Sequence, residues 1–168
     1  MNGGMELYLH MPFCVRKCAY CDFLSFPSGA ETQRMYAKRL MKDIDAMGKK
    51  YGDIPVDTIF IGGGTPSVPD SALIVGIMEH VRKAFHVAEG AEISMEANPG
   101  TVTREKLTDY RRAGINRLSF GLQSANDREL KLLGRIHTWA EFLESFHLAR
   151  ECGFTNINID LMSALPGQ

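Results

Sequence analysis

The sequence predicts an α/β fold in which parallel strands and helices alternate along the chain. Five short apolar segments with strand character are separated by amphipathic segments with helical periodicity, and Gly, Pro and Asn residues break the chain between them. A polar or glycine-rich element also follows each apolar strand. Parallel strands that carry polar groups at their carboxyl ends are typical of a (β/α) barrel, so we favour part of a TIM-like barrel over a doubly wound sheet.

The five predicted strands are compact and apolar, and each one ends at a breaker or a polar element. Pro12 follows the first strand closely, and Gly62 breaks the second, which is rich in β-branched side chains. The strands are expected at residues 6–10, 56–61, 92–96, 116–120 and 156–161.

Periodicity predicts the first two helices. In residues 32–47, Tyr36, Leu40 and Ile44 recur every four positions, as in an amphipathic helix. Pro69 is expected to open the second helix, because proline fits the first helical position. The apolar stripe of this helix is Leu73, Ile77, Val81 and Phe85.

Capping residues predict three more helices. Thr103 is a candidate N-cap for a short helix before the fourth strand. Asn126 with Glu129, and Thr138 with Glu141, each match a capping box, in which the cap and the residue three positions later bond each other's backbone. Two helical segments are therefore expected between the fourth and fifth strands.

Composition indicates one globular domain over residues 1–168, since 45% of the side chains are apolar and the chain can bury a core. Nineteen basic and twenty acidic side chains give a net charge of −1, which offers no electrostatic basis for binding nucleic acid. No apolar run approaches the roughly 20 residues of a membrane span, so no transmembrane segment is expected. Clustered cysteines without a disulfide framework indicate a reducing compartment, and we expect a cytoplasmic protein.

Three of the four cysteines form the run Cys14-Val-Arg-Lys-Cys18-Ala-Tyr-Cys21. Three thiolates on one loop can hold an iron–sulfur cluster, and a cubane with three protein ligands keeps one iron open to a small ligand. A zinc site with a fourth ligand from elsewhere, and free thiols, are the alternatives, although no second cysteine knuckle is present. Cys152 lies near the end of a helix that runs about 20 Å back to the opposite face, so we exclude it as a ligand and expect a small buried side chain.

Six motifs in order resemble the radical S-adenosylmethionine (SAM) superfamily, and within it the oxygen-independent coproporphyrinogen III oxidase family with its haem-chaperone branch. One of these motifs is the cysteine run, and the resemblance extends from about Leu7 to the last residue. The others are Tyr-Leu-His-Met-Pro-Phe-Cys, Gly-Gly-Gly-Thr-Pro-Ser, Glu-Ala-Asn-Pro, Leu-Ser-Phe-Gly-Leu-Gln-Ser and Asn-Ile-Asp-Leu-Met-Ser-Ala-Leu-Pro-Gly-Gln.

The resemblance implies a [4Fe–4S] cluster on Cys14, Cys18 and Cys21, with S-adenosyl-L-methionine on the open iron. The positions that match the family's SAM or cluster contacts are Tyr8, Tyr20, Gly63, Gly64, Thr65, Glu96, Gln123, Arg135 and Asp160. The residues themselves agree with this, because glycines let backbone amides approach a ligand and carboxylates at the ends of apolar strands need a polar partner. The alternatives are a plain turn for the glycines, core packing for the tyrosines and a solvated surface for Arg135.

The two histidines near these motifs receive no role in the site. For His10 and His137, structural or surface positions are expected.

The chemistry that the resemblance implies is one-electron cleavage of SAM to methionine and a 5′-deoxyadenosyl radical. The oxidase motif continues to a fourth cysteine two residues after the third, where this chain has Phe23, as the chaperone-type proteins do. We therefore expect haem binding and delivery, with haem as ligand and a haem-accepting protein as partner. The first alternative is a SAM-dependent coproporphyrinogen dehydrogenase that decarboxylates the propionates of its porphyrinogen substrate. The second alternative is a structural iron–sulfur or zinc module.

The resemblance also predicts how much of the family's barrel these residues form. The family barrel has six strands, whereas five are predicted here, so we expect residues 1–168 to form a radical SAM core domain truncated before the barrel is complete, with the C-terminal domain absent. An incomplete barrel exposes apolar edges, which predicts low solubility and poor two-state unfolding for the isolated chain.

Overall fold

The computed structural model describes residues 4–168 and contains the expected alternation of strands and helices. The strands are β1 (Met5–Met11), β2 (Val56–Gly63), β3 (Val87–Ala97), β4 (Arg117–Gln123) and β5 (Asn156–Leu161). The helices are α1 (Ala30–Tyr51), α2 (Ser71–Ala84), α3 (Arg104–Arg112), α4 (Asp127–Leu132) and α5 (Trp139–Glu151). All five predicted strands are confirmed, and β3 begins five residues earlier than expected. No helix in the described part of the chain is long and apolar enough to cross a membrane.

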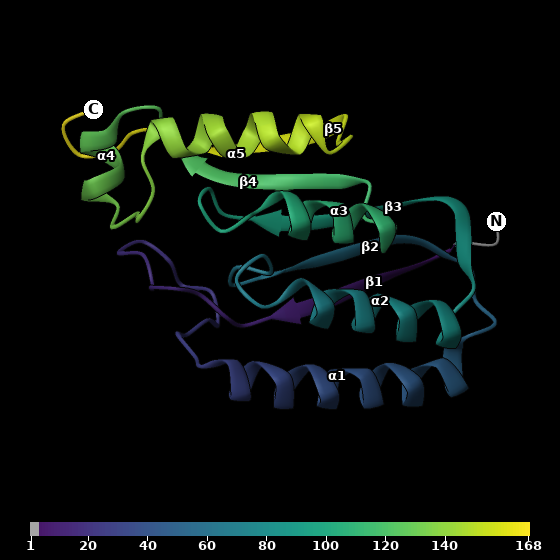
Figure 1. Cartoon of the computed structure of the whole chain (residues 1–168). Coiled ribbons are helices and arrows are strands. Elements are labelled where there is room, and N and C mark those ends of the chain that lie inside the picture. The colour runs from purple at the N-terminus through teal and green to yellow at the C-terminus, as the bar shows by residue number, and fades with distance from the viewer. Residues whose placement is uncertain (1–3) are drawn as a thin grey trace.

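The strands form one parallel sheet in the order β1-β2-β3-β4-β5. The packed neighbours α1 and α2, α2 and α3, and α3 and α5 follow the same order, and Figure 1 shows these helices wrapped around the outside of a curved, open sheet. A doubly wound sheet would carry helices on both faces and reverse its strand order. The expected partial (β/α) barrel is therefore confirmed.

Side chains alternate between the two faces of the sheet. Leu9, Ile61, Met95 and Phe120 are buried beneath the helices in the hydrophobic core. The residues between them face the inside of the curved sheet, where the register places polar side chains side by side. Glu96 is paired with Ser119 in neighbouring strands, and Ser119 is paired with Asn158.

The start of α2 differs from the prediction. Asp70 is the N-cap, because its side chain accepts a hydrogen bond from the backbone N–H of Ala72 at 3.0 Å, and Pro69 lies one residue ahead of the cap. The buried apolar residues of this helix are Ile74, Ile77, Met78 and Val81, so the stripe follows the 3.6-residue turn more closely than a strict spacing of four.

One of the two predicted capping boxes is confirmed and the other is wrong. Thr138 and Glu141 bond each other's backbone at the start of α5. Asn126 does cap α4, but the carboxylate of Glu129 accepts from the hydroxyl of Ser124 instead of from the cap residue. Ser124 in turn accepts from the backbone N–H of Asn126, so its hydroxyl takes the place that the sequence pattern assigned to Glu129. The predicted cap at Thr103 is confirmed.

Candidate cluster and cofactor site

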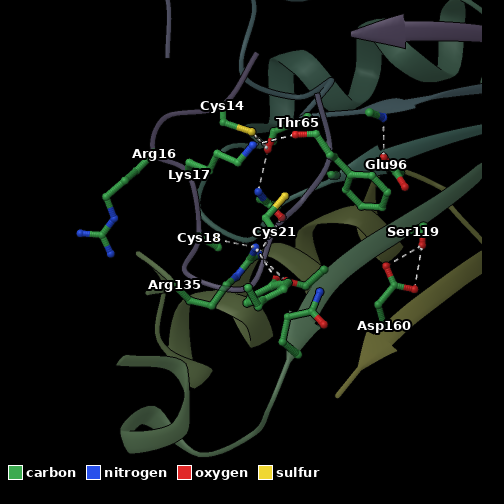
Figure 2. A pocket seen from close by; sticks show the side chains of 18 residues that line it. Cys14, Arg16, Lys17, Cys18, Cys21, Thr65, Glu96, Ser119, Arg135 and Asp160 are labelled. Carbon is green, nitrogen blue, oxygen red and sulfur yellow. Dashed lines mark hydrogen bonds between the residues drawn. The ribbon is translucent and has the colours of Figure 1, made fainter. Parts of the chain in front are cut away.

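A pocket at the carboxyl ends of the strands collects residues from β2, β3, β4 and β5, from the segments that follow them, and from the cysteine loop that follows β1 (Figure 2). Its lining includes nearly all of the predicted site residues together with several that were not predicted. The residues that line it are Cys14, Arg16, Lys17, Cys18, Tyr20, Cys21, Phe23, Gly63, Gly64, Thr65, Glu96, Ala97, Asn98, Ser119, Gly121, Gln123, Arg135 and Asp160.

The loop that carries the cysteines is held at its base and at its middle. The backbone N–H of Cys14 donates to the carbonyl of Phe26 at 3.2 Å, and the backbone N–H of Phe26 donates to the carbonyl of Pro12 at 2.8 Å. These two hydrogen bonds hold the ends of the loop together. Phe13 is fully buried and packs edge-on against Phe26. The backbone N–H of Ala19 reaches across to the end of α4. These bonds fix the positions from which the cysteine side chains enter the pocket.

The three thiols are half-buried and two of them already contact possible hydrogen-bond donors. The Sγ atom of Cys14 is 3.5 Å from Thr65 Oγ1, and that of Cys18 is 3.6 Å from Arg135 Nη1. Within residues 4–168, no three His, Cys, Asp or Glu side chains form a group that could hold a single metal ion. Three cysteines on one rim of a pocket, with donors beside the sulfurs of Cys14 and Cys18, fit the ligand set of an iron–sulfur cluster.

Cys152 does not line this pocket. It is the C-cap of α5, and its sulfur lies 4.0 Å from the carbonyl oxygen of Arg104. The side chain is half-buried, so the prediction of a buried residue holds only in part.

The glycine motif has its backbone amides turned toward the protein. Gly63 N–H donates to Glu96 Oε2 at 2.9 Å, Gly64 N–H to Met11 O at 2.8 Å, and Thr65 N–H to Phe13 O at 2.6 Å. The expectation that these amides face a ligand is therefore wrong. A ligand in this pocket meets the other atoms of the motif. The amides of Gly64 and Thr65 join the end of β2 to the start of the cysteine loop, and the amide of Gly63 joins β2 to Glu96 in β3.

The two predicted carboxylates form an acidic half of the pocket. Burial raises the pKa of Glu96 above its ordinary value, the Gly63 N–H opposes this, and the charge of Asp160 adds to it. Asp160 accepts from Asn158 Nδ2 at 2.7 Å and from Ser119 Oγ at 3.3 Å. Among residues 4–168, Glu96 has one hydrogen-bond donor, so its remaining acceptor capacity faces the pocket.

A basic half lies opposite, around Arg135. Helix α4 sits beyond the carboxyl ends of the strands (Figure 1). Arg135, which follows α4 in the sequence, lines the pocket. The guanidinium donates to Asn98 Oδ1 at 2.7 Å and to the carbonyl of Gly121, and Nη1 lies 3.5 Å from the hydroxyl of Tyr20. The alternative of a solvated surface arginine is wrong, since this side chain is half-buried and bonded on several sides.

Tyr20 and Gln123 line the pocket, as predicted, whereas the predicted residue Tyr8 does not. Burial raises the pKa of Tyr20, and the nearby Arg135 opposes the shift. Gln123 has a φ of 75°, which a residue with a side chain seldom adopts and which is typical of functional sites. Tyr8 is 58% exposed and lies further down β1, where its hydroxyl is 2.9 Å from His10 Nδ1.

The two histidines have structural surroundings, in agreement with the expectation. His10 Nε2 donates to the carbonyl of Leu24 at 3.0 Å, which ties the cysteine loop to β1. His137 is 5% exposed, and neither ring nitrogen has a hydrogen-bond partner within residues 4–168. Burial lowers the pKa of His137 to about 4, and the positive charge of Arg135 acts in the same direction.

Sequence reasoning did not assign Asn98 or Ser119 to the site. A signal for both was present, because side chains two residues apart on a strand share a face. Asn98 stands two residues after Glu96, and Ser119 stands four residues before Gln123. The basic residues Arg16 and Lys17 carried no comparable signal, since they lie in a loop without periodicity.

The sequence matches the radical SAM superfamily over residues 8–168. It is 44% identical to the haem chaperone HemW of Escherichia coli, over 98% of this chain and 44% of that protein. It is 38% identical to HemW of Bacillus subtilis, over 96% of this chain and 43% of that protein. It is also 35% identical to the mitochondrial radical S-adenosyl methionine domain-containing protein 1 of Danio rerio, over 97% and 37% respectively. The chain thus spans less than half the length of these relatives.

Solved structures agree with this match. The coproporphyrinogen III oxidase HemN of E. coli, described as a radical SAM enzyme, superposes with a TM-score of 0.91 at 31% identity, over all of this chain and 39% of that one. The Elp3 protein of Methanocaldococcus infernus superposes with a TM-score of 0.62 at 14% identity, over 98% of this chain and 39% of that one, which is a likeness of fold alone. Since the family match covers nearly the whole chain and the cysteine run lies inside it, the chain belongs to the radical SAM superfamily.

Proposed function

We propose that this chain forms the radical SAM part of a haem chaperone of the HemW type. It binds a [4Fe–4S] cluster through Cys14, Cys18 and Cys21 and binds SAM in the adjoining pocket. The observation that carries the proposal is the convergence of three thiols, a glycine motif and two oppositely charged groups of side chains on one pocket. The 44% identity to E. coli HemW supports the chaperone assignment.

The pocket suits a ligand such as SAM, which carries an ammonium group, a carboxylate and ribose hydroxyls. Glu96 and Asp160 offer acceptors to the ammonium and hydroxyl groups, and Arg135 offers a positive charge. When bound together, a reduced cluster and SAM supply one-electron cleavage of a C–S bond. The protein's own part is to orient the ligand and to exclude water, which the half-buried positions of the three cysteines support.

Phe23 favours the chaperone over the oxidase. It stands two residues after the third cysteine, is 66% exposed and lies at the rim of the pocket, where the family resemblance places a further cysteine in oxidases. The oxidase is the second candidate, and the TM-score of 0.91 with HemN favours it. The sequence identity to HemW is higher, at 44% against 31% for HemN.

The cysteines of residues 4–168 are all free thiols, which suits a reducing compartment, and a cytoplasmic location is part of the proposal.

The first test is anaerobic reconstitution with iron and sulfide, followed by electron paramagnetic resonance of the reduced protein with and without SAM. We expect a [4Fe–4S] signal whose shape changes when SAM is added. Cys18→Ser should lose the cluster, and the matched control Cys152→Ser should keep it, because Cys152 lies outside the pocket. A cluster signal indifferent to SAM would leave a structural iron–sulfur module, and zinc in place of iron would overturn the assignment of the cysteines.

A second test separates chaperone from oxidase. The full chain is titrated with haem and, separately, incubated with coproporphyrinogen, SAM and a reductant. Stoichiometric haem binding without release of carbon dioxide is the expected result. Decarboxylation of coproporphyrinogen would favour the oxidase instead.

A further inference from the structure

Asn98 links two of the proposed cluster ligands through side-chain contacts. It follows β3 directly, and its Nδ2 atom lies 2.8 Å from Thr65 Oγ1 while its Oδ1 atom lies 2.7 Å from Arg135 Nη2. Thr65 Oγ1 is 3.5 Å from Cys14 Sγ, and Arg135 Nη1 is 3.6 Å from Cys18 Sγ. Figure 2 shows Thr65 and Arg135 reaching the two sulfurs from opposite sides of the pocket.

The direction of each hydrogen bond follows from the chemistry of the groups. A guanidinium only donates, so Asn98 Oδ1 accepts from Arg135, and this fixes the orientation of the amide. Asn98 Nδ2 therefore donates to Thr65 Oγ1.

Thr65 as a residue is 2% exposed, and its hydroxyl then has its hydrogen free for Cys14 Sγ. A metal-bound thiolate sulfur accepts and does not donate. Asn98 is thus connected to two donors that each contact a cysteine sulfur: the Thr65 hydroxyl at Cys14 and the Arg135 guanidinium at Cys18.

We propose that Asn98 is a positioning residue that tunes the reduction potential of the cluster by directing the Thr65 hydroxyl and the Arg135 guanidinium at the sulfurs of Cys14 and Cys18. The inference rests on the proposed function, since it requires the cluster. Hydrogen bonds to the sulfurs stabilise the more negative, reduced cluster and therefore raise its potential. The backbone N–H of Asn98 separately donates to Ser67 Oγ at 3.2 Å, so a change of side chain leaves this backbone bond in place.

Asn98→Asp tests the proposal in the full chain. Its carboxylate still accepts from Arg135 but cannot donate to Thr65, so the Thr65 hydroxyl turns to the carboxylate and leaves Cys14 Sγ. Losing a hydrogen bond of this kind should lower the reduced-to-oxidised ratio at a fixed potential about tenfold, which is about 59 mV for a one-electron couple. The readout is a redox titration followed by electron paramagnetic resonance, with iron and sulfide content measured in each sample.

The added negative charge is separated from the hydroxyl effect by a double-mutant cycle with Thr65→Val, which removes the hydroxyl. In the Thr65→Val background, Asn98→Asp retains only its charge effect, so its shift should be smaller than in the wild-type background. Thr65→Ser keeps the hydroxyl and should keep the wild-type potential.

The outcomes distinguish this inference from the proposed function. Equal Asn98→Asp shifts in both backgrounds, or variants with full clusters and unchanged potentials, would overturn the role of Asn98 alone. A wild-type chain that takes up no [4Fe–4S] cluster would overturn the proposed function and the role of Asn98 with it.

Discussion

Gly64 lies directly against the backbone of Phe13, the residue that precedes the first cysteine. A Cβ atom at Gly64 would stand 2.7 Å from the Phe13 carbonyl oxygen and 2.9 Å from its nitrogen. Hydrogen bonds from Gly64 N–H to Met11 and from Thr65 N–H to Phe13 hold the two segments at this distance. The glycine motif is therefore the surface against which the base of the cysteine loop is packed.

Gly64→Ala should destabilise the fold and impair cluster uptake. The atoms that a new methyl group would meet belong to the backbone, which cannot turn aside, so the loss should be about 2 kcal/mol or more. Urea unfolding and iron content after reconstitution measure the two effects. Gly76→Ala is the matched control, because there a Cβ meets only the flexible end of Met41 and the helix gains propensity, so stability should stay within about 1 kcal/mol of wild type. Equal stability of the two variants would contradict this account.

Glu96→Gln should weaken SAM binding while leaving the fold at least as stable at neutral pH. Burial raises the pKa of Glu96 in the folded state, so the folded chain disfavours the ionised form. The contribution of this carboxyl to the free energy of unfolding is fully present below the pKa of Glu96 in the unfolded chain. It is lost as the pH rises through the higher pKa of Glu96 in the folded chain. The amide keeps an acceptor for Gly63 N–H and removes that pH dependence.

SAM affinity, measured by calorimetry, should fall about tenfold or more in Glu96→Gln, because a charged acceptor is lost. Glu92→Gln lies on the same strand but outside the pocket, and it should leave SAM affinity unchanged. Unaltered SAM binding in Glu96→Gln would remove Glu96 from the proposed ligand set.

His137→Gln should flatten the pH dependence of stability in mild acid. The pKa of His137 is lowered to about 4 from an ordinary value of 6.5, so the unfolded chain binds a proton between these values and the folded chain does not. Stability is therefore highest above pH 6.5 and falls by about 3 kcal/mol as the pH drops to 4. Unfolding free energies at pH 7 and 4.5 test this, with exposed His147→Gln as the control. A wild-type slope in His137→Gln would disprove it.

Lys106→Met should loosen the segment that follows the glycine motif. The Nζ atom of Lys106 donates to the carbonyls of Ser67, Val68 and Thr101 at 2.7, 3.2 and 3.4 Å, and burial lowers its pKa. Methionine keeps the length of the side chain but leaves these carbonyls without their donor, which should cost about 2 kcal/mol. Lys38→Met, on the exposed face of α1, should change the free energy of unfolding by less than about 0.5 kcal/mol. Comparable losses in both variants would argue against the role of Lys106.

Most of the fold followed from local patterns in the sequence. Strands, caps and apolar stripes depend on residues a few positions apart, and the alternation of elements restricts the sheet to a few topologies. Two details of the predicted helix starts were wrong because another nearby side chain made the hydrogen bond. Asp70, and not Pro69, begins α2 as its N-cap, and the carboxylate of Glu129 accepts from Ser124 instead of from Asn126.

The sequence predicted which residues form the site but not the hydrogen bonds between them. The cysteines, Glu96 and Asp160 follow from strand ends, and they do line one pocket. The direction of the Gly64 amide depends on how closely β1 approaches β2, and that of the Gly63 amide depends on the carboxylate of Glu96 in β3, neither of which a local pattern encodes. The place of Asn98 between Thr65 and Arg135 depends on three loops at once.

The sequential order of the sheet has a consequence for biosynthesis. Each strand pairs with its neighbour in the sequence, so the sheet can grow from β1 as the ribosome delivers the chain. The cysteine loop emerges first, but Arg135, which contacts Cys18, follows 117 residues after it, and at typical elongation rates this delay is about 6 to 23 s. An iron–sulfur cluster inserted during that interval would stand open to oxygen. Metallation should therefore follow translation of the fourth strand and α4 rather than accompany the cysteines as they leave the ribosome.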